Sequence, residues 1–195
     1  MREKGIDYFE NSRRATVAHR AYATANPMGW EGYGNDVWGL TACDGPLDAT
    51  LPVHGRSRTF HTYWPRGASL VYVNDDGTIA PTAAAGSIAF APEIAVAALR
   101  EMTRRWGPLV WNAYGFVDAF NPTLDDPAVA VRHGRIEPGV GWFDGDRLGI
   151  DQGPMLAMIE NARSGLIWNT MRKNPHLIRG LQRAGFRGGW LDQAR

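Results

Sequence analysis

The stretch LGIDQGPMLAMIENARSGLIW, residues 148–168, has the clearest helical pattern in the chain. Apolar residues recur in it every three or four positions, which predicts a helix with one buried face. These residues are Met155, Met158, Ile159, Ala162 and Leu166. Gly165 lies inside the pattern at a cost of about 1 kcal/mol relative to alanine, so we expect a bend or a close contact there.

Asp151 stands just before the apolar run and is predicted to cap this helix. Its carboxylate can accept hydrogen bonds from the free backbone amides of the first turn, where the helix dipole favours the ionised form. Pro154 fits the first turn, because a proline there has no intrahelical hydrogen bond to lose. Beside Gln152 and Gly153 the same carboxylate would also be held where a ligand can approach. The local pattern fits both a simple cap and a functional carboxylate.

Four further segments are predicted to form helices, so we expect a mainly α-helical chain. They are residues 6–25, 92–106, 125–135 and 175–184. The expected buried face of the first comprises Ile6, Phe9, Val17 and Ala21. Asn26 ends that helix, because a residue before proline avoids the helical conformation.

Between these helices we expect long loops and one small β-hairpin. The hairpin has strands over residues 68–73 and 78–80, joined by a turn at residues 74–77. The segments rich in glycine and aromatic residues are 28–65, 111–123 and 137–146, the second of which also fits a short irregular helix. Long loops inside a compact domain are uncommon and usually functional, so we expect them to form a cleft.

The composition is that of a globular protein without a strong charge bias. The chain has 195 residues, of which 44% are hydrophobic and 21% charged, and its formal net charge is +1. A nucleic acid or an anionic membrane surface is therefore not the expected partner, whereas an uncharged substrate is compatible with this balance. No apolar run is long enough to cross a bilayer, and the first residues lack the apolar centre of a signal peptide.

Cysteine and histidine give no sign of a metal or cofactor site. Cys43 is the sole cysteine, and no nucleophile signature surrounds it, so we expect a small buried side chain. The histidines are scattered, and none is spaced as in a structural zinc site.

Tryptophan is the most unusual part of the composition. The eight tryptophans are Trp30, Trp38, Trp64, Trp106, Trp111, Trp142, Trp168 and Trp190, mostly in or beside loops. Indole rings on loops suit a sugar-binding cleft, because the C–H face of a pyranose packs on them. For any single tryptophan, however, filling a gap in the core is the more common role.

Two further acids have both a structural and a functional interpretation. Asp44 follows Trp38 and Thr41 and precedes Gly45, where an aspartate commonly forms a turn. Glu93 falls in the first turn of a predicted helix, where the helix dipole alone favours an acid. Either side chain could instead line the expected cleft.

Several blocks of the sequence together resemble the bacterial glycoamylase-like domain family, which includes endo-β-1,2-glucanases and relatives of cyclic β-1,2-glucan synthases. The blocks are WGLTACDGP (38–46), DGTIAPTAAAGSIAFAPE (76–93), YGFVDAFNPT (114–123), the stretch 148–168 and KNPHLIRGLQRAGF (173–186). They occur in the family's order and span nearly the whole chain, so their combined specificity is high.

The resemblance implies an (α/α)6 toroid with a cleft of loops at one end. It implies hydrolysis of a glucan by an acid and a base, with inversion and without a metal. A toroid needs twelve helices, so residues 1–195 are expected to be one partial domain, the C-terminal half. Where relatives have a short segment after the Gly-Pro turn, this chain has a longer one over residues 47–74, so subsites around it could differ.

On this resemblance Asp151 is the first candidate for a catalytic carboxylate, and Asp44 and Glu93 are weaker ones. The candidate sugar contacts are Trp38, Asp118, Asn121 and Gln152. The catalytic acid could also lie in the other half of the domain.

Two other functions remain open at this stage: a non-catalytic glucan-binding remnant, and an accessory domain of a cyclic β-glucan synthase. A partial toroid would expose apolar faces, so we expect the isolated chain to associate, or to need the missing half, or to be only marginally stable. The full-length protein is expected to be periplasmic or secreted.

Overall fold

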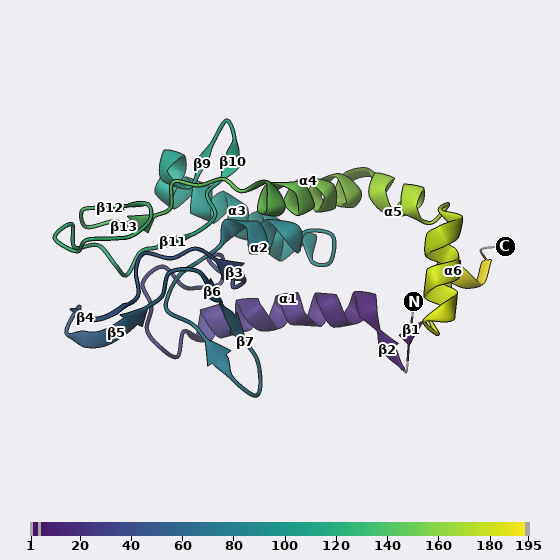
Figure 1. Ribbon diagram of the computed structural model, residues 1–195, viewed down its shortest axis with the longest axis horizontal. Coiled ribbons are helices and arrows are strands. Elements are labelled where there is room, and N and C mark those ends of the chain that lie inside the picture. The colour runs from purple at the N-terminus through teal and green to yellow at the C-terminus, as the bar shows by residue number, and fades with distance from the viewer. Residues whose placement is uncertain (1, 4, 194–195) are drawn as a thin grey trace.

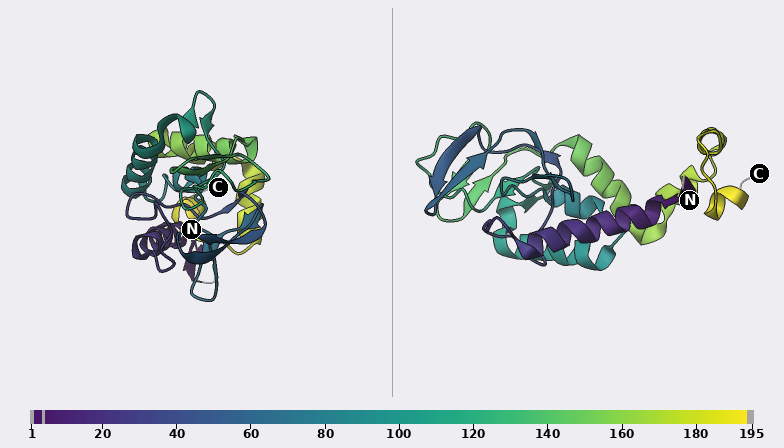
Figure 2. Two further views of the ribbon diagram at one scale, coloured as in Figure 1. Left: turned by 90° about the vertical axis from the view of Figure 1, so that its left-hand side faces the viewer. Right: turned by 90° about the horizontal axis from the view of Figure 1, so that it is seen from below.

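The computed structural model describes residues 2–3 and 5–193 and is mainly α-helical, as expected. The helices are α1 (Tyr8–Ala25), α2 (Pro81–Gly86), α3 (Pro92–Trp106), α4 (Gly149–Ser164), α5 (Leu166–Met171) and α6 (Pro175–Arg183), with short 3-10 helices at Gly107–Leu109 and Gly189–Gln193. Loops and small sheets gather at one end, and α1 and α4 extend from them toward α5 and α6 (Figure 1, Figure 2). The described parts of both termini lie at this helical end.

The strands are short, and each described pair is antiparallel. They are β1 (Arg2–Glu3), β2 (Ile6–Asp7), β3 (Ala42–Cys43), β4 (Ala49–Val53), β5 (Arg56–Phe60), β6 (Trp64–Pro65), β7 (Gly67–Ala68), β8 (Val73–Asn74), β9 (Trp111–Asn112), β10 (Gly115–Phe116), β11 (Phe120–Asn121), β12 (Arg135–Glu137) and β13 (Gly141–Phe143). One sheet has three strands in the order β11-β13-β12, and the others described have two. These ladders fix loops against one another and do not build a central sheet.

The stretch 148–168 is helical but does not begin as predicted. The N-cap of α4 is Leu148, and Asp151 is the third residue of the helix, so the prediction that Asp151 caps it is wrong. The Leu148 carbonyl accepts from the amides of Asp151 and Gln152. Pro154 therefore lies inside the helix. Gly165 adopts the left-handed conformation and separates α4 from α5, at the position where a bend or a close contact is predicted.

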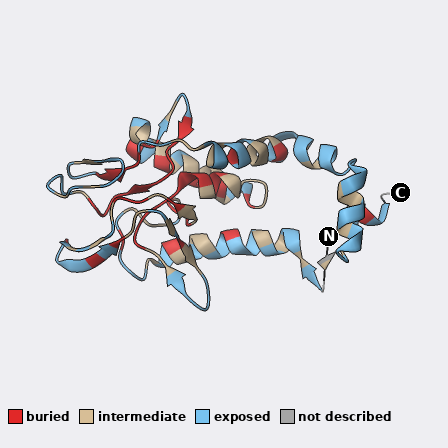
Figure 3. Cartoon of the chain, in the orientation of Figure 1, coloured by how far each residue is buried: buried red, intermediate tan, exposed pale blue. Residues whose placement is uncertain are grey.

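Helix α1 forms close to the predicted range but buries a different face. Asp7 caps it by accepting from two first-turn amides, and Asn26 ends it in the left-handed conformation. Its buried residues are Thr16 and Ala23, whereas Val17 is 45% exposed. Ile6, Phe9, Val17 and Ala21 of the predicted face are all exposed, although the ring of Phe9 contacts those of Phe90 and Trp168 (Figure 3).

Two local predictions fail and two elements were not predicted, because tertiary packing decides the conformation of these segments. Residues 125–135 form turns and extended chain instead of a helix. Residues 81–86 form the helix α2, which begins with proline and packs against α3 and α4. The predicted hairpin forms earlier in the chain, where β7 pairs with β8 and residues 69–72 connect them. Asp76, predicted to lie in the turn, is instead buried in an ion pair with Arg66. A second hairpin, β4-β5, was not predicted.

The core lies where α2, α3 and the sheet β11-β13-β12 meet (Figure 3). Its largest fully enclosed side chains include Trp38, Trp142, Phe60, Phe120, Ile79 and Met102. Phe120 stacks on Phe143 with ring centroids 5.8 Å apart and contacts Trp106 at 4.7 Å. Most loop tryptophans near this core therefore fill it, which is the common structural role for this side chain.

Among the described residues, no helix is both long and apolar enough to span a membrane.

The contrast between α1 and α3 predicts very different mutational costs. Met102 of α3 is fully buried, so M102A should lower the free energy of unfolding by about 2–5 kcal/mol. V17S on the open face of α1 should change it by less than about 0.5 kcal/mol. Urea denaturation followed by tryptophan fluorescence measures both. An equal loss in V17S would show that this face is covered in solution.

Candidate active site

Five aspartates from distant parts of the sequence come together at the loop-rich end of the molecule. We call them the acid cluster: Asp44, Asp118, Asp144, Asp146 and Asp151. Asp44, Asp144 and Asp146 each place an oxygen atom within 4.8 Å of the other two. Asp118 accepts a hydrogen bond of 2.7 Å from the Asp44 amide, and its side chain also interacts with that of Asp151.

Backbone pairing brings these aspartates together. Asp44 directly follows β3, and Asp144 directly follows β13. The Asp118 amide donates to the Asp146 carbonyl at 3.0 Å, and the Asp144 amide donates to the Ala119 carbonyl at 3.0 Å. Residues 118–121 and 142–146 thus run side by side, continuing the β11-β13 pairing. Asp151 reaches the cluster from the first turn of α4.

Asp118 is the most enclosed member of the cluster, at 1% exposure. Burial raises its pKa to about 7, because a charge is costly to hold away from water. The hydrogen bond from the Asp44 amide opposes this rise in pKa, while the negative charges of Asp151, Asp144 and Asp44 add to it. One of its oxygens has no hydrogen-bond partner in the described structure. Asp118 therefore holds a proton over much of the acidic to neutral range.

Two neighbours of Asp118, Asp144 and Asp151, also have raised pKa values. Burial raises the pKa of Asp144, against the lowering effect of the Asp146 and Gly145 amides. Burial likewise raises the pKa of Asp151, although its interaction with Asp118 lowers it. Among the residues that the structure describes, no lysine or arginine forms an ion pair with the acid cluster. Of these carboxyl groups, Asp118, with its pKa of about 7, can therefore carry a proton close to neutral pH.

The spacing of Asp44, Asp144 and Asp146 is compact enough for a cation to bridge their oxygens. Acidic groups gather at this spacing in many proteins without an ion. Retained protons give the cluster another means of lowering its charge, so we assign no metal ligand.

The structure joins three of the sequence candidates and separates the others. Asp44, Asp118 and Asp151 belong to the acid cluster. Glu93 is exposed in the first turn of α3, where the helix dipole accounts for an acid, and it takes no part in the described contacts of the cluster.

Two candidate sugar contacts are used to hold the backbone. The Asn121 amide is fully buried; it donates to the Asp76 carbonyl and the Thr78 hydroxyl and accepts from the Thr123 amide. The Gln152 side chain donates to the Phe116 carbonyl at 2.7 Å. Their amides tie the loops together around the site.

Two hollows border the segments that carry the acid cluster. One of about 300 Å³ lies between α1 and α2 and is lined by Trp38, Thr41 and His19 among others. The indole N–H of Trp38 has no hydrogen-bond partner in the described structure. A second hollow, of about 550 Å³, is lined by Asp144, Arg147 and Asn112 among others. Both combine apolar and polar groups, as carbohydrate-binding surfaces require.

Sequence reasoning missed Asp144 and Asp146 as candidates. They flank Gly145 in the segment GWFDGD, which reads as a glycine-rich turn. The available signal was the place of Asp144 directly after two aromatic residues, Trp142 and Phe143, which the structure shows to be buried. Cys43, by contrast, is buried with its pKa raised to about 12, mainly by burial, which makes it a poor nucleophile.

Comparisons with known proteins agree with the resemblance found in the sequence. The model of the Glycoamylase family, described as "Putative glucoamylase", matches residues 1–175. An "Exo beta-1,2-glucooligosaccharide sophorohydrolase (non-reducing end)" from Parabacteroides distasonis is 33% identical over 183 residues. That alignment covers 93% of this chain but 21% of the relative. The chain thus spans about a fifth of the length of this curated relative.

Solved structures match nearly the whole chain. An endo-beta-1,2-glucanase from Chitinophaga pinensis, in complex with sophorotriose and glucose, superposes with a TM-score of 0.75 at 29% identity. A "putative glucoamylase" from Bacteroides uniformis gives a TM-score of 0.73 at 36% identity. Each alignment covers 97% of this chain and 38% of the other.

The raised pKa of Asp118 predicts a pH-dependent stability. Between about pH 4 and about pH 7 the folded chain keeps a proton that the unfolded chain has released, so stability should fall as the pH rises. A tenfold change in proton affinity corresponds to about 1.4 kcal/mol, and hydration at the site edge reduces the effect. We expect wild type to lose about 2 kcal/mol more than D118N across this range.

Denaturant unfolding at a series of pH values measures this difference. D126N, at an exposed aspartate outside the acid cluster, is the control and should follow wild type. Parallel curves for wild type and D118N would show that Asp118 titrates normally.

Proposed function

Because this chain belongs to the Glycoamylase family, we propose that it forms part of a glycoside hydrolase that cleaves a glucose polymer, with β-1,2-glucan as substrate. The observation that carries the proposal is the acid cluster, in which five aspartates lie together and three of them, Asp118, Asp144 and Asp151, have raised pKa values. The printed names of the Parabacteroides and Chitinophaga relatives support the choice of glucan.

Hydrolysis of a glycosidic bond needs an acid to protonate the leaving oxygen and a base to activate water. In the inverting reaction proposed here the two carboxyl groups stand about 6.5–9.5 Å apart, which leaves room for the water. We assign Asp151 the role of a reacting carboxylate, because it is partly exposed and its pKa is raised. The partner carboxyl group comes either from Asp44, which is also partly exposed, or from outside this chain.

Asp118 supports this reaction from beneath the surface. It is too enclosed to touch a polysaccharide, but its proton can be shared with Asp151. The arrangement keeps Asp151 from being surrounded only by negative charge.

Two hollows near the site, one bordered by Thr41 and the other by Asn112 and Arg147, would hold glucose units by packing and hydroxyl contacts. Trp38 is only 2% exposed, so it fills the core and is too enclosed to pack on a glucose ring. Glu93 keeps no catalytic role in this proposal.

A glucan-binding role without turnover is the second candidate. It is favoured by the short span of the chain, which covers 38% of the solved relatives, so that an acid or base could lie outside it. Such a segment would retain the hollows and bind glucan without releasing products. A place as an accessory domain of a cyclic β-glucan synthase is a variant of this role.

The architecture and location of the whole protein are proposals of the same kind. The six described helices are proposed to form part of an (α/α)6 toroid, with residues 1–195 as a single partial domain. TM-scores of 0.72–0.75 against glucanase structures support a shared fold over this region. A polysaccharide substrate suits a periplasmic or secreted protein.

Replacement of Asp151 tests the proposal. D151N should lower hydrolysis of β-1,2-glucan by about 100-fold or more, because the amide can neither give nor take the proton. The asparagine is nearly isosteric, so the fold should persist, as circular dichroism would verify. Released oligosaccharides are measured by chromatography and the anomer formed by NMR. D126N should keep wild-type turnover.

Retained turnover in D151N would remove this residue from the reaction. Glucan binding without products in the wild-type chain would favour the second candidate.

A further inference from the structure

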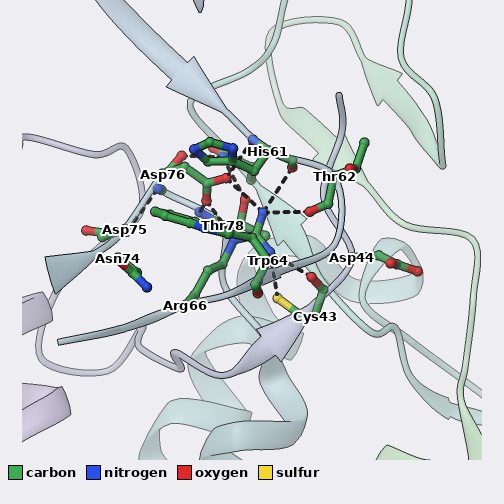
Figure 4. A network of polar contacts seen from close by, with 12 residues as sticks. Cys43, Asp44, His61, Thr62, Trp64, Arg66, Asn74, Asp75, Asp76 and Thr78 are labelled. Atoms are coloured by element: carbon green, nitrogen blue, oxygen red, sulfur yellow. Dashed lines mark hydrogen bonds and ion pairs between the residues drawn. The ribbon is translucent and has the colours of Figure 1, made fainter. Parts of the chain in front are cut away.

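Arg66 and Asp76 form a fully buried ion pair beside the acid cluster. The Arg66 side chain is 0% exposed and that of Asp76 is 1% exposed. Both carboxylate oxygens are engaged, Oδ1 by Nε at 2.7 Å and Oδ2 by Nη2 at 2.8 Å. Figure 4 shows the pair enclosed between the loop of His61 and Thr62 and the strand that ends at Cys43.

The remaining donors of Arg66 bind backbone carbonyls from two segments. Nη1 donates to the Cys43 carbonyl at 2.7 Å and to the Trp64 carbonyl at 3.3 Å. Nη2 also donates to the carbonyls of His61 and Thr62 at 3.0 and 3.2 Å. Every nitrogen of the guanidinium is therefore used, in a fork geometry that lysine does not have.

Asp76 extends the same network to a third segment. It accepts from the His61 amide at 3.0 Å and from the Thr78 amide at 3.2 Å. The pair thus joins β3, the loop before β6 and the segment before α2, each of which depends on the other two.

Asp44 is held from both sides by this arrangement. On one side, the Cys43 carbonyl is bound by Arg66, and Cys43 pairs with Trp64 across β3 and β6. On the other side, a Cβ on Gly45 would overlap the His61 carbonyl and the Arg66 guanidinium, so only glycine fits. The Asp44 amide in between donates to Asp118 at 2.7 Å.

We propose that Arg66, together with Asp76, is a positioning residue that fixes the Asp44 amide on Asp118 and so sets the geometry of the acid cluster. The effect on turnover rests on the proposed function, whereas the effect on the Asp44 amide does not. Arg66 itself is too deeply buried to touch a substrate.

Arg58 is a matched control for a buried arginine. It is nearly buried, donates to the carbonyls of Met28 and Gly29 at 2.7 Å each, and stacks over Trp30 at 4.0 Å. Its described contacts do not include the acid cluster. A loss of stability alone should speed the exchange of Asp44 and of the core amides alike in either variant, while a positioning effect should be seen only in R66K.

The test compares amide hydrogen exchange and kinetics in the 195-residue chain. In R66K the Asp44 amide should exchange at least about 10-fold faster relative to the core amides of α3. The reason is that the Cys43 carbonyl, which belongs to the same peptide group as this amide, loses its hydrogen bond from Arg66. G45A should have the same local effect, since it displaces the guanidinium. R58K should leave the relative exchange of Asp44 unchanged. Where hydrolysis is measurable, kcat should fall in R66K and G45A with KM within about twofold.

Unchanged relative protection of Asp44 in R66K and G45A, or an equal rise in R58K, would overturn the proposal. If R66K does not fold, G45A decides it by the same readout. If the wild-type chain binds glucan without releasing products, the glucan-binding candidate is favoured over hydrolysis by this chain alone, but hydrogen exchange still decides the positioning role.

Discussion

The ion pair of Arg66 and Asp76 is the interaction on which the arrangement of the loops depends. Two charges buried together usually cost more in lost hydration than their attraction returns. Here that cost is offset because both oxygens of Asp76 and every nitrogen of Arg66 have partners. An apolar pair could fill the same volume, but it could not bind carbonyls from separate segments. The main effect of the pair is therefore to fix one arrangement of the loops, and its net contribution to the free energy of unfolding is secondary.

The acid cluster is built on the opposite principle. Its carboxyl groups face one another without a described cationic partner, so burial and repulsion raise the pKa values of Asp118, Asp144 and Asp151. Such a group of acids stays together only if the backbone holds it there. Two features provide that constraint. Residues 118–121 pair with residues 142–146, and the hydrogen bond from Arg66 to the Cys43 carbonyl holds the peptide before Asp44. The Arg66–Asp76 pair, whose polar groups all have partners, thus supports the acid cluster, in which one oxygen each of Asp118 and Asp144 has no described hydrogen-bond partner.

Sequence patterns predicted the elements whose residues decide their own conformation. The ranges of α1, α3 and α6 and the break at Gly165 follow from caps, proline and glycine. The faces that these helices bury, and the β-pairings of the loops, depend on contacts between distant residues and were not predictable. Asp118 illustrates the same limit. The sequence marked it as a candidate sugar contact, but its raised pKa results from burial in the folded chain and could not be predicted. The expected substrate class and the choice of Asp151 as the first catalytic candidate came from the resemblance to glucanases and not from local patterns.

Helix α4 runs from the loop-rich end of the molecule toward α5 and α6 (Figure 1). It has 16 residues and is about 24 Å long, with Asp151 in its first turn and Gly165 just beyond its last. A rotation of α4 by about five degrees around its C-terminal end would move Asp151 by about 2 Å. Displacements of this size are enough to disturb the alignment of a reacting group with its substrate. A contact that shifts the C-terminal end of α4 would therefore also change the position of the Asp151 carboxylate.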